Sequence, residues 1–219
     1  MPPDLIIRQL EQCDYQLTLD AMKQFTAARE QHCIDELWLL QHAPVYTLGR
    51  NGRQEHLLDT ADIPVLRVDR GGQVTYHGPG QVVMYVLLDL QRRHQGIRQL
   101  VKALENSVIQ LLATDNIMAV PRRDAPGVYV DNQKIASLGL RVTRGKCYHG
   151  LSLNVSMDLT PFNGINPCGI PGLMVTQLAD LTGQTDCNQA GLTLSAAFAG
   201  LFGYQRIKIT EQGPDLAVA

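Results

Sequence analysis

The sequence predicts an α+β protein built on a mixed, largely antiparallel sheet that is flanked by helices. Apolar strand patterns follow one another directly between residues 127 and 159 and are separated only by short turns, so neighbouring strands are expected to pair antiparallel. Helical periodicity occurs before and after these strands but not between each pair of them. The regular alternation of strand and helix that builds a parallel sheet is therefore not expected.

The N-terminal half is predicted to contain one helix and several strands. A single apolar stripe predicts an amphipathic helix over residues 18–31. Residues 36–49 are expected to form a buried strand that is interrupted at residues 43–44, because the residue before a proline is restricted and proline cannot donate to a ladder. Apolar runs at 63–68 and 82–90 predict two further strands.

The C-terminal half has the clearest helical signal. Apolar residues between Ile97 and Leu112 recur with a period close to 3.6, which predicts a helix over residues 97–113. Three strands are expected within residues 127–159. The remaining predicted elements, in chain order, are a structured loop at 160–172, helices at 175–181 and 192–202, and a strand at 206–209.

The size and composition of the chain bound its class. A chain of 219 residues, 45% of them hydrophobic and 18% charged, suits one globular domain. We expect that domain to span residues 1–219, with a core at about 30–207 and a disordered tail at about 210–219. The net charge of −2 gives no attraction toward nucleic acid or an anionic membrane, so neither is expected as a partner.

The cysteines and histidines indicate a reduced protein without a metal. The 5 cysteines and 6 histidines are scattered without the paired spacing of zinc sites. An odd number of cysteines in a chain of this length argues for free thiols in the cytosol rather than for disulfides. The first residues contain no apolar run long enough for a signal peptide or a membrane span, which also favours a cytoplasmic protein.

A glycine-rich stretch, RGGQVTYHGPGQ from Arg70 to Gln81, is the first candidate functional element. It lacks the GxxxxGK[ST] and GxGxxG patterns, and it connects two strands, whereas phosphate-binding loops lead into a helix. A nucleotide-dependent enzyme of either kind is therefore disfavoured. Four glycines around Thr75, Tyr76 and His77 suit an elongated ligand that lies against a bare backbone. A hairpin tip whose glycines only serve turns is the alternative.

Cys168 is the candidate nucleophile. It lies in Asn166-Pro167-Cys168-Gly169, where we expect the amide of Gly169 to be uncrowded and able to stabilise an oxyanion. The alternative is a buried, inert cysteine, which is what we expect of the other four. Those four, Cys13, Cys33, Cys147 and Cys187, lie on predicted helices, strands or polar loops without such a setting.

A nucleophilic thiol needs a neighbouring cation or base, because a thiol near its ordinary pKa is mostly protonated. The candidates are Lys134, His77 and His149. Small residues follow Lys134 and leave space for a ligand, although an exposed hairpin lysine is the common alternative. Strand alternation places His149 on the face of Leu151, where it would be a core histidine. The residues alone thus indicate a thiol nucleophile and an elongated, acyl-type ligand.

Four ordered motifs resemble the lipoyl(octanoyl) transferase family. The match covers residues from about 36 to 201, and we find no departure at a motif position. The motifs are Arg70-Gly71-Gly72 with Thr75-Tyr76-His77, Gly80-Gln81 and Tyr85; Lys134-Ile135-Ala136-Ser137-Leu138-Gly139; His149-Gly150-Leu151-Ser152-Leu153-Asn154; and Asn166-Pro167-Cys168-Gly169.

The resemblance implies a catalytic domain with the fold of biotin and lipoate protein ligases and a two-step acyl transfer without a cofactor. Cys168 would take the octanoyl group from octanoyl-acyl carrier protein, and a lysine of a lipoyl domain would then receive it. The acceptors would be 2-oxoacid dehydrogenase complexes and the glycine cleavage H protein. Lys134 would lower the pKa of Cys168 and carry the proton. An exchange of one thioester for another is nearly neutral in energy, so ATP is not needed.

The resemblance also implies the binding positions. They are Arg70, Gly71, Gly72, Gln73, Val74, Thr75, Tyr76, His77, Ser137, Leu138, Gly139, Gly150, Leu151 and Ser152, with His149 in a supporting role. Three alternatives stay open, namely an ATP-dependent lipoate or octanoate ligase, an acyl-binding module without activity, and a thioesterase. The cysteine favours the transferase over the ligase. An acidic carrier would be bound by basic residues, for which the candidates are Arg50, Arg53, Arg144 and Lys146.

Overall fold

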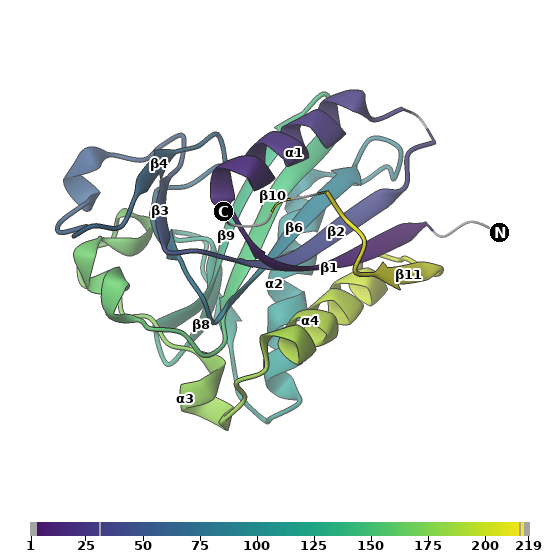
Figure 1. Cartoon of the computed structure of the whole chain (residues 1–219). Coiled ribbons are helices and arrows are strands. Elements are labelled where there is room, and N and C mark those ends of the chain that lie inside the picture. Colours follow the sequence, from purple (N-terminus) through teal and green to yellow (C-terminus); the bar gives the residue numbers. More distant parts are fainter. Residues whose placement is uncertain (1–3, 31, 215, 217–219) are drawn as a thin grey trace.

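The strands form two sheets in the computed structural model, which describes residues 4–30, 32–214 and 216 (Figure 1). The larger sheet has eight strands in the order β11-β1-β2-β6-β10-β9-β8-β7. All its neighbours from β2 to β7 pair antiparallel, whereas β1 pairs parallel with both β2 and β11. This confirms the predicted mixed, largely antiparallel sheet. The strands are β1 (Leu5–Cys13), β2 (Asp35–His42), β6 (Gln81–Asp89), β7 (Val120–Pro121), β8 (Gly127–Val130), β9 (Gln133–Thr143), β10 (Lys146–Asn154) and β11 (Ile207–Thr210).

The smaller sheet carries the glycine-rich segment. Its three strands are β4 (Val65–Arg67), β3 (Val45–Leu48) and β5 (Val74–His77), in that spatial order. The predicted interruption at residues 43–44 is the point where the chain leaves β2 in the large sheet and enters β3 in the small one. Part of the stretch expected to be a loop is itself a strand, because β5 pairs with β3 along its whole length.

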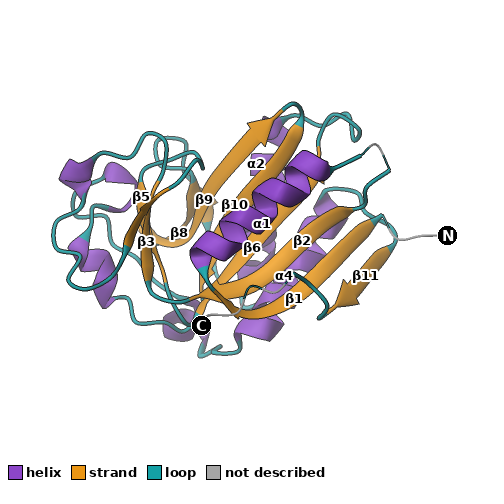
Figure 2. Ribbon diagram, turned by 45° about the horizontal axis from the view of Figure 1, so that its top comes forward, coloured by secondary structure: helices purple, strands orange, loops and turns teal. Residues whose placement is uncertain are grey.

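Helices cover both faces of the large sheet. Helix α1 (Tyr15–Ala28) lies on one face, and α2 (Ile97–Ala113) and α4 (Cys187–Leu201) lie on the other (Figure 2). The short α3 (Leu178–Thr182) precedes α4, and three 3-10 turns occur at Gln54–His56, Thr160–Gly164 and Pro167–Gly169. Among the residues that the structure describes, no helix is long and apolar enough to cross a membrane.

Helix boundaries follow the caps rather than the apolar stripes. The bounds of α2 match the prediction. Helix α1 begins three residues earlier than predicted because the Asp14 carboxylate accepts a hydrogen bond from the amide of Leu17. It ends at Ala28, and residue 31, its predicted end, lies outside the described residues. Helix α4 begins five residues early because Asp186 caps it through the amides of Asn188 and Gln189.

Two further strands besides β5 were not predicted, namely β1 and β7. Strand β1 has only a short apolar start, but its parallel partners on both sides make it an interior strand. Leu5 and Ile7 are fully buried in the core between the sheet and the α2–α4 layer. In the tail predicted to be disordered, Leu216 is buried and its carbonyl accepts a hydrogen bond from the amide of Asp14. Residues 215 and 217–219 lie outside the described residues.

Candidate active site

The structure brings Lys134 and Cys168 together. Lys134 lies near the start of β9, and Cys168 lies in the 3-10 turn Pro167–Gly169. The ammonium nitrogen Nζ of Lys134 is 3.0 Å from the sulfur Sγ of Cys168. Neither His77 nor His149 takes this place. The ring nitrogens of His77 contact Gln81 and Thr47, and Nε2 of His149 contacts Asp69.

The Lys134 ammonium is buried among neutral groups. Lys134 is 2% exposed, and its Nζ donates to the carbonyl of Pro126 at 2.9 Å and to the phenol oxygen of Tyr129 at 3.0 Å. The Tyr129 hydroxyl in turn donates to the carbonyl of Ala125. Within the described part of the chain, no carboxylate lies within ion-pair distance of Lys134. Burying an ammonium without an anion is costly, and a thiolate on Cys168 would compensate for that cost.

The backbone around Cys168 differs from the expectation. Cys168 itself has a left-handed backbone, with φ 58°, which is uncommon for a residue other than glycine. The amide of Gly169 donates to the carbonyl of Asn166 at 2.8 Å, so the predicted role of that amide in an oxyanion hole is wrong. This hydrogen bond is of the 3-10 type, so the Gly169 amide that was expected to be free is used within the turn.

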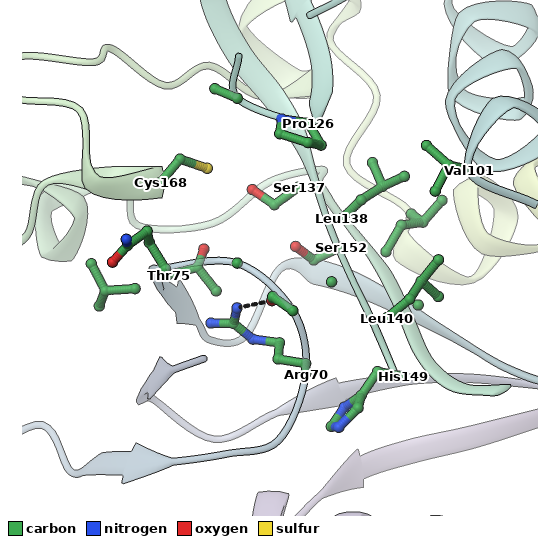
Figure 3. Close-up of a pocket in the computed structure, with 18 of the residues that line it drawn as sticks. Arg70, Thr75, Val101, Pro126, Ser137, Leu138, Leu140, His149, Ser152 and Cys168 are labelled. Atoms are coloured by element: carbon green, nitrogen blue, oxygen red, sulfur yellow. Dashed lines mark hydrogen bonds between the residues drawn. The ribbon is translucent and has the colours of Figure 1, made fainter. Parts of the chain in front are cut away.

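Cys168 borders a cavity of about 370 Å³ (Figure 3). Of the predicted binding positions, only Tyr76 does not line it; its ring packs on Tyr46 and Phe162 in the small sheet. The hydroxyls of Thr75, Ser137 and Ser152 line the cavity and make no hydrogen bond to another described residue. They are therefore available to a ligand or to an oxyanion.

Two other polar side chains that line the cavity, Arg70 and Tyr85, are hydrogen-bonded within the protein. The guanidinium of buried Arg70 donates to the carbonyl of Thr47 at 2.6 Å and to that of Gly71 at 2.9 Å. The Tyr85 hydroxyl donates to Nε2 of His42, since Nδ1 of that ring donates to a carbonyl. Burial lowers the pKa of His42 to about 4 and that of His77 to about 3, so both rings are neutral.

His149 faces the other side of the sheet from the one that was predicted. Its φ of 61° breaks the strand alternation, and its ring stacks on Tyr148 rather than joining Leu151 in the core. Nε2 of His149 is 3.0 Å from Oδ1 of Asp69, whose other oxygen accepts from the Tyr148 hydroxyl. Burial alone would raise the pKa of Asp69, but these hydrogen bonds hold it below its usual value. His149 thereby anchors the residue that precedes Arg70.

Two glycines of the motifs allow close packing within the protein. A Cβ on Gly139 would lie 2.8 Å from Cδ of Arg70, and one on Gly150 would lie 1.9 Å from the carbonyl oxygen of Met84. The expected free space beside Gly139 is thus occupied by the Arg70 side chain. Gly139 is required so that the Arg70 side chain can approach the sheet.

A model of the lipoyl protein ligase A/B catalytic domain matches residues 14–199. The chain is 60% identical to an octanoyltransferase of Thiobacillus denitrificans over 82% of each chain. It is 54% identical to an octanoyltransferase of Marinomonas sp. over 93% of this chain and 95% of that one. The chain belongs to the lipoyl protein ligase A/B family.

Solved structures share the fold of this family member. A lipoate-protein ligase A bound with ATP superposes with a TM-score of 0.76, at 15% identity, over 97% of this chain and 89% of that one. A biotin protein ligase of Aquifex aeolicus superposes with a TM-score of 0.57, at 16% identity, over 91% of this chain and 70% of that one. The predicted fold is confirmed. At this identity the likeness concerns the fold and not the ligase reaction.

Several residues at or near the cavity were not predicted from the sequence. Pro126, which borders the cavity, and Tyr129, which contacts Lys134, come from a segment without a functional pattern. Val83 lines the cavity because β6 is paired with β10 at Ser152, which in turn pairs with Ser137. Once the register of β6 and β10 is known, Val83 could have been found from its partner Ser152.

The other cysteines and the candidate docking cations Arg144 and Lys146 lie away from Cys168, whereas Arg50 and Arg53 flank Asn51, which lines the cavity. Burial raises the pKa of Cys13 and Cys187 to about 11 and that of Cys147 to about 12, so these thiols stay protonated. Arg144 and Lys146 lie at the β9–β10 turn, roughly 30 Å along β9 from Lys134. The Arg53 guanidinium pairs with Glu55. A carrier that presents its thioester to Cys168 would therefore not need the Arg144 turn.

Proposed function

We propose that this chain, an octanoyltransferase, moves an octanoyl group from a carrier to a lysine of a lipoyl domain through a thioester on Cys168. The observation that carries this proposal is the 3.0 Å contact between Lys134 Nζ and Cys168 Sγ at the border of the cavity. A buried cation beside a half-buried thiol is the arrangement that promotes a thiolate nucleophile.

In the first step, the Cys168 thiolate attacks the carbonyl carbon of the donor thioester. A new C–S bond forms on Cys168, the donor C–S bond breaks, and the departing sulfur takes the proton that Lys134 received from Cys168. We propose octanoyl-acyl carrier protein as the donor. One thioester replaces another, so the step needs neither ATP nor a cofactor.

In the second step, the amine of the acceptor lysine attacks the Cys168 thioester. The amide C–N bond forms, the C–S bond breaks, and the amine proton returns through Lys134 to the sulfur. Acylation removes the anion beside Lys134, and burial then favours the neutral amine that this step requires. The proposed acceptors are the lipoyl domains of 2-oxoacid dehydrogenase complexes and the glycine cleavage H protein. A cytoplasmic location stays a prediction.

The part of the cavity lined by Thr75, Val83 and Ser152, here called the inner part, is the proposed site of the octanoyl chain. Val83 is 2% exposed, Ser152 4% and Thr75 7%, so a chain there is shielded from water. The neighbouring Arg70, His77 and Tyr85 have hydrogen-bond partners inside the protein. Burying the octanoyl hydrocarbon contributes roughly 5 kcal/mol at about 0.8 kcal/mol per methylene.

Intact-protein mass spectrometry tests the proposal. The wild type and Cys168→Ala are mixed with octanoyl-acyl carrier protein, with and without a lipoyl domain. We expect the wild type to gain one hydroxylamine-sensitive octanoyl group and to lose it to the lipoyl domain, whereas the variant gains none. Modification of the lipoyl domain only with ATP and free octanoate would indicate a ligase. Release of free octanoate alone would indicate a thioesterase.

A further inference from the structure

The outer edge of β9 borders the cavity without a partner strand. Strand β8 pairs with β9 only as far as Ser137, whereas β9 continues to Thr143. Among the described residues, the backbone hydrogen bond made to this edge beyond Ser137 comes from Gly71, whose amide donates to the carbonyl of Leu140 at 2.9 Å. An unpaired edge is a template for another extended chain.

Three peptide groups of this edge face the cavity. In a strand the N–H and C=O of alternate residues point to the same side. The Leu140 carbonyl points away from β10, so the Leu140 amide and both backbone groups of Leu138 point away from it as well. No described residue forms a hydrogen bond with these three groups. Leu138 and Leu140 both line the cavity, so unused backbone donors and an acceptor border the ligand space.

The cavity extends to both sides of β9. Figure 3 shows Cys168, Thr75 and Arg70 on one side of the strand and Val101, Leu138 and Leu140 on the other. The inner part, beside Thr75, is lined by buried residues. The outer part is open, because Ile97 at the start of α2 lines the cavity and is 47% exposed.

We propose that the outer part of the cavity binds the pantetheine-type arm of the acyl donor, and that the amides of this arm pair with Leu138 and Leu140 like an added strand. This inference rests on the proposed function. The acyl chain occupies the inner part, so the arm on the other side of the thioester must leave through the open part. An arm with secondary amides supplies the N–H and C=O groups that the edge lacks.

The outer part fits an unbranched arm better than a polypeptide. Val101 and Ile97 of α2 border it on one side, and Gly71 ends the unpaired stretch on the other. The available edge, from Leu138 to Leu140, spans roughly 7 Å, which accommodates two consecutive amides without side chains. The acceptor protein needs to bring only a lysine side chain to Cys168.

The first test compares donors on the wild-type enzyme. S-octanoyl pantetheine is compared with an analogue in which esters replace both amides, which removes the N–H donors but keeps the length. We expect acylation of Cys168, followed by intact mass in single-turnover reactions, to be about 10-fold slower with the ester analogue, because it cannot donate to the Leu138 carbonyl and its ester carbonyls accept more weakly from the Leu138 and Leu140 amides. Equal rates would overturn the inference.

The second test changes the edge. Leu138→Pro removes one outward amide, and Val142→Pro is the matched control, because Val142 lies on the same edge but does not line the cavity. Proline is tolerated on an edge where its nitrogen faces away from the sheet. We expect the rate ratio of the two donors to decrease in part in Leu138→Pro, because an amide that distinguishes an amide carbonyl from an ester carbonyl is gone, and to stay at the wild-type value in Val142→Pro.

Failure of this inference and failure of the proposed function can be told apart. An unchanged donor ratio in Leu138→Pro, with slower transfer from the preformed octanoyl-enzyme to a lipoyl domain, would assign the edge to the acceptor and overturn the inference. If no donor acylates Cys168, the proposed function fails and the inference fails with it. If Leu138→Pro does not fold, the comparison of donors on the wild type still decides.

Discussion

Two buried cations of this protein differ in what balances them. The side chain of Arg29 is fully buried, and its guanidinium forms a short ion pair with the equally buried Asp35. Asp35 also pairs with Arg92 at 2.6 Å and accepts a hydrogen bond from the Tyr204 hydroxyl at 2.8 Å. Lys134 is as deeply buried, yet among the described residues its partners are carbonyls, a phenol and the Cys168 thiol.

The charges around Asp35 therefore serve the structure, whereas the surroundings of Lys134 suit a chemical reaction. Burial of a charge is compensated at Asp35 when the protein folds, because the opposite charge is a permanent part of the chain. Among the described groups that contact Lys134, only the Tyr129 phenol and the Cys168 thiol can ionise, and burial raises the pKa of Tyr129, so the opposite charge has to come from a thiol that loses its proton. The molecule therefore keeps a site whose stability depends on the state of its nucleophile.

The largest expected effect is on catalysis by Lys134. Lys134→Met is expected to slow acylation of Cys168 by about 10²–10⁴-fold, because the thiolate loses its cation and the proton loses its carrier. The free energy of unfolding should not decrease, since a buried charge without a carboxylate is removed. Single-turnover mass spectrometry and urea unfolding measure the two quantities. A variant that is slow only because it is unfolded would contradict this account.

The converse effect is expected at Asp35. Asp35→Ala leaves Arg29 buried without its carboxylate, so the free energy of unfolding should fall by about 3–5 kcal/mol. The acylation rate per folded molecule should stay near the wild-type value. Urea denaturation measures the change, and Asp62→Ala, at an exposed acid, is the control. A large loss of rate in folded Asp35→Ala would mean that this cluster also takes part in catalysis.

The neutral histidines predict a loss of stability in acid. Burial lowers the pKa of His42 to about 4 and of His77 to about 3, below the ordinary value near 6.5. The unfolded chain therefore binds more protons between these values, and stability falls as the pH drops through 6.5 toward 4. The change is about 2 kcal/mol for each ring between pH 7 and pH 5.

Urea unfolding at several pH values tests this slope. His77→Gln should lose one ring's share of the pH dependence, whereas His94→Gln, at an exposed site, should keep all of it. A slope that does not change in His77→Gln would mean that this ring takes up its proton at the same pH in the folded and the unfolded protein.

The smallest effect concerns the phenol beside the ammonium. Tyr129→Phe removes one acceptor of Lys134 and one donor to the Ala125 carbonyl. We expect a loss of about 1 kcal/mol in transition-state stabilisation, which is roughly a fivefold slower acylation. The rate in single turnover measures it. A loss as large as that of Lys134→Met would make Tyr129 a proton carrier rather than a positioning residue.

Local signals account for what the sequence predicted well. Helix α2 matches its predicted bounds because its period is unbroken, and the strands of β8 to β10 follow their turns. Cys168 and Lys134 could be selected because proline, glycine and small residues surround them. These features depend on neighbours within a few residues.

The errors arise where distant segments or unusual backbones decide. Strand β1 depends on β2 and on β11, which is about 200 residues away in the chain. His149 lies on the opposite face from the predicted one because its φ is left-handed, and the Gly169 amide is hydrogen-bonded within its turn. Neither a period nor a composition reveals such a backbone. The contact of Lys134 with Tyr129 also requires the bulge between β8 and β9.

The measurement that tests the central claim most directly is alkylation of Cys168 by iodoacetamide at neutral pH in the wild type and in Lys134→Met. Peptide mapping follows each cysteine separately, and Cys147 serves as the internal control. The account predicts that Cys168 reacts much faster than Cys147 in the wild type and loses most of that advantage in Lys134→Met. Equal reactivity of Cys168 in the two proteins would show that Lys134 does not support the thiolate, and would contradict the account.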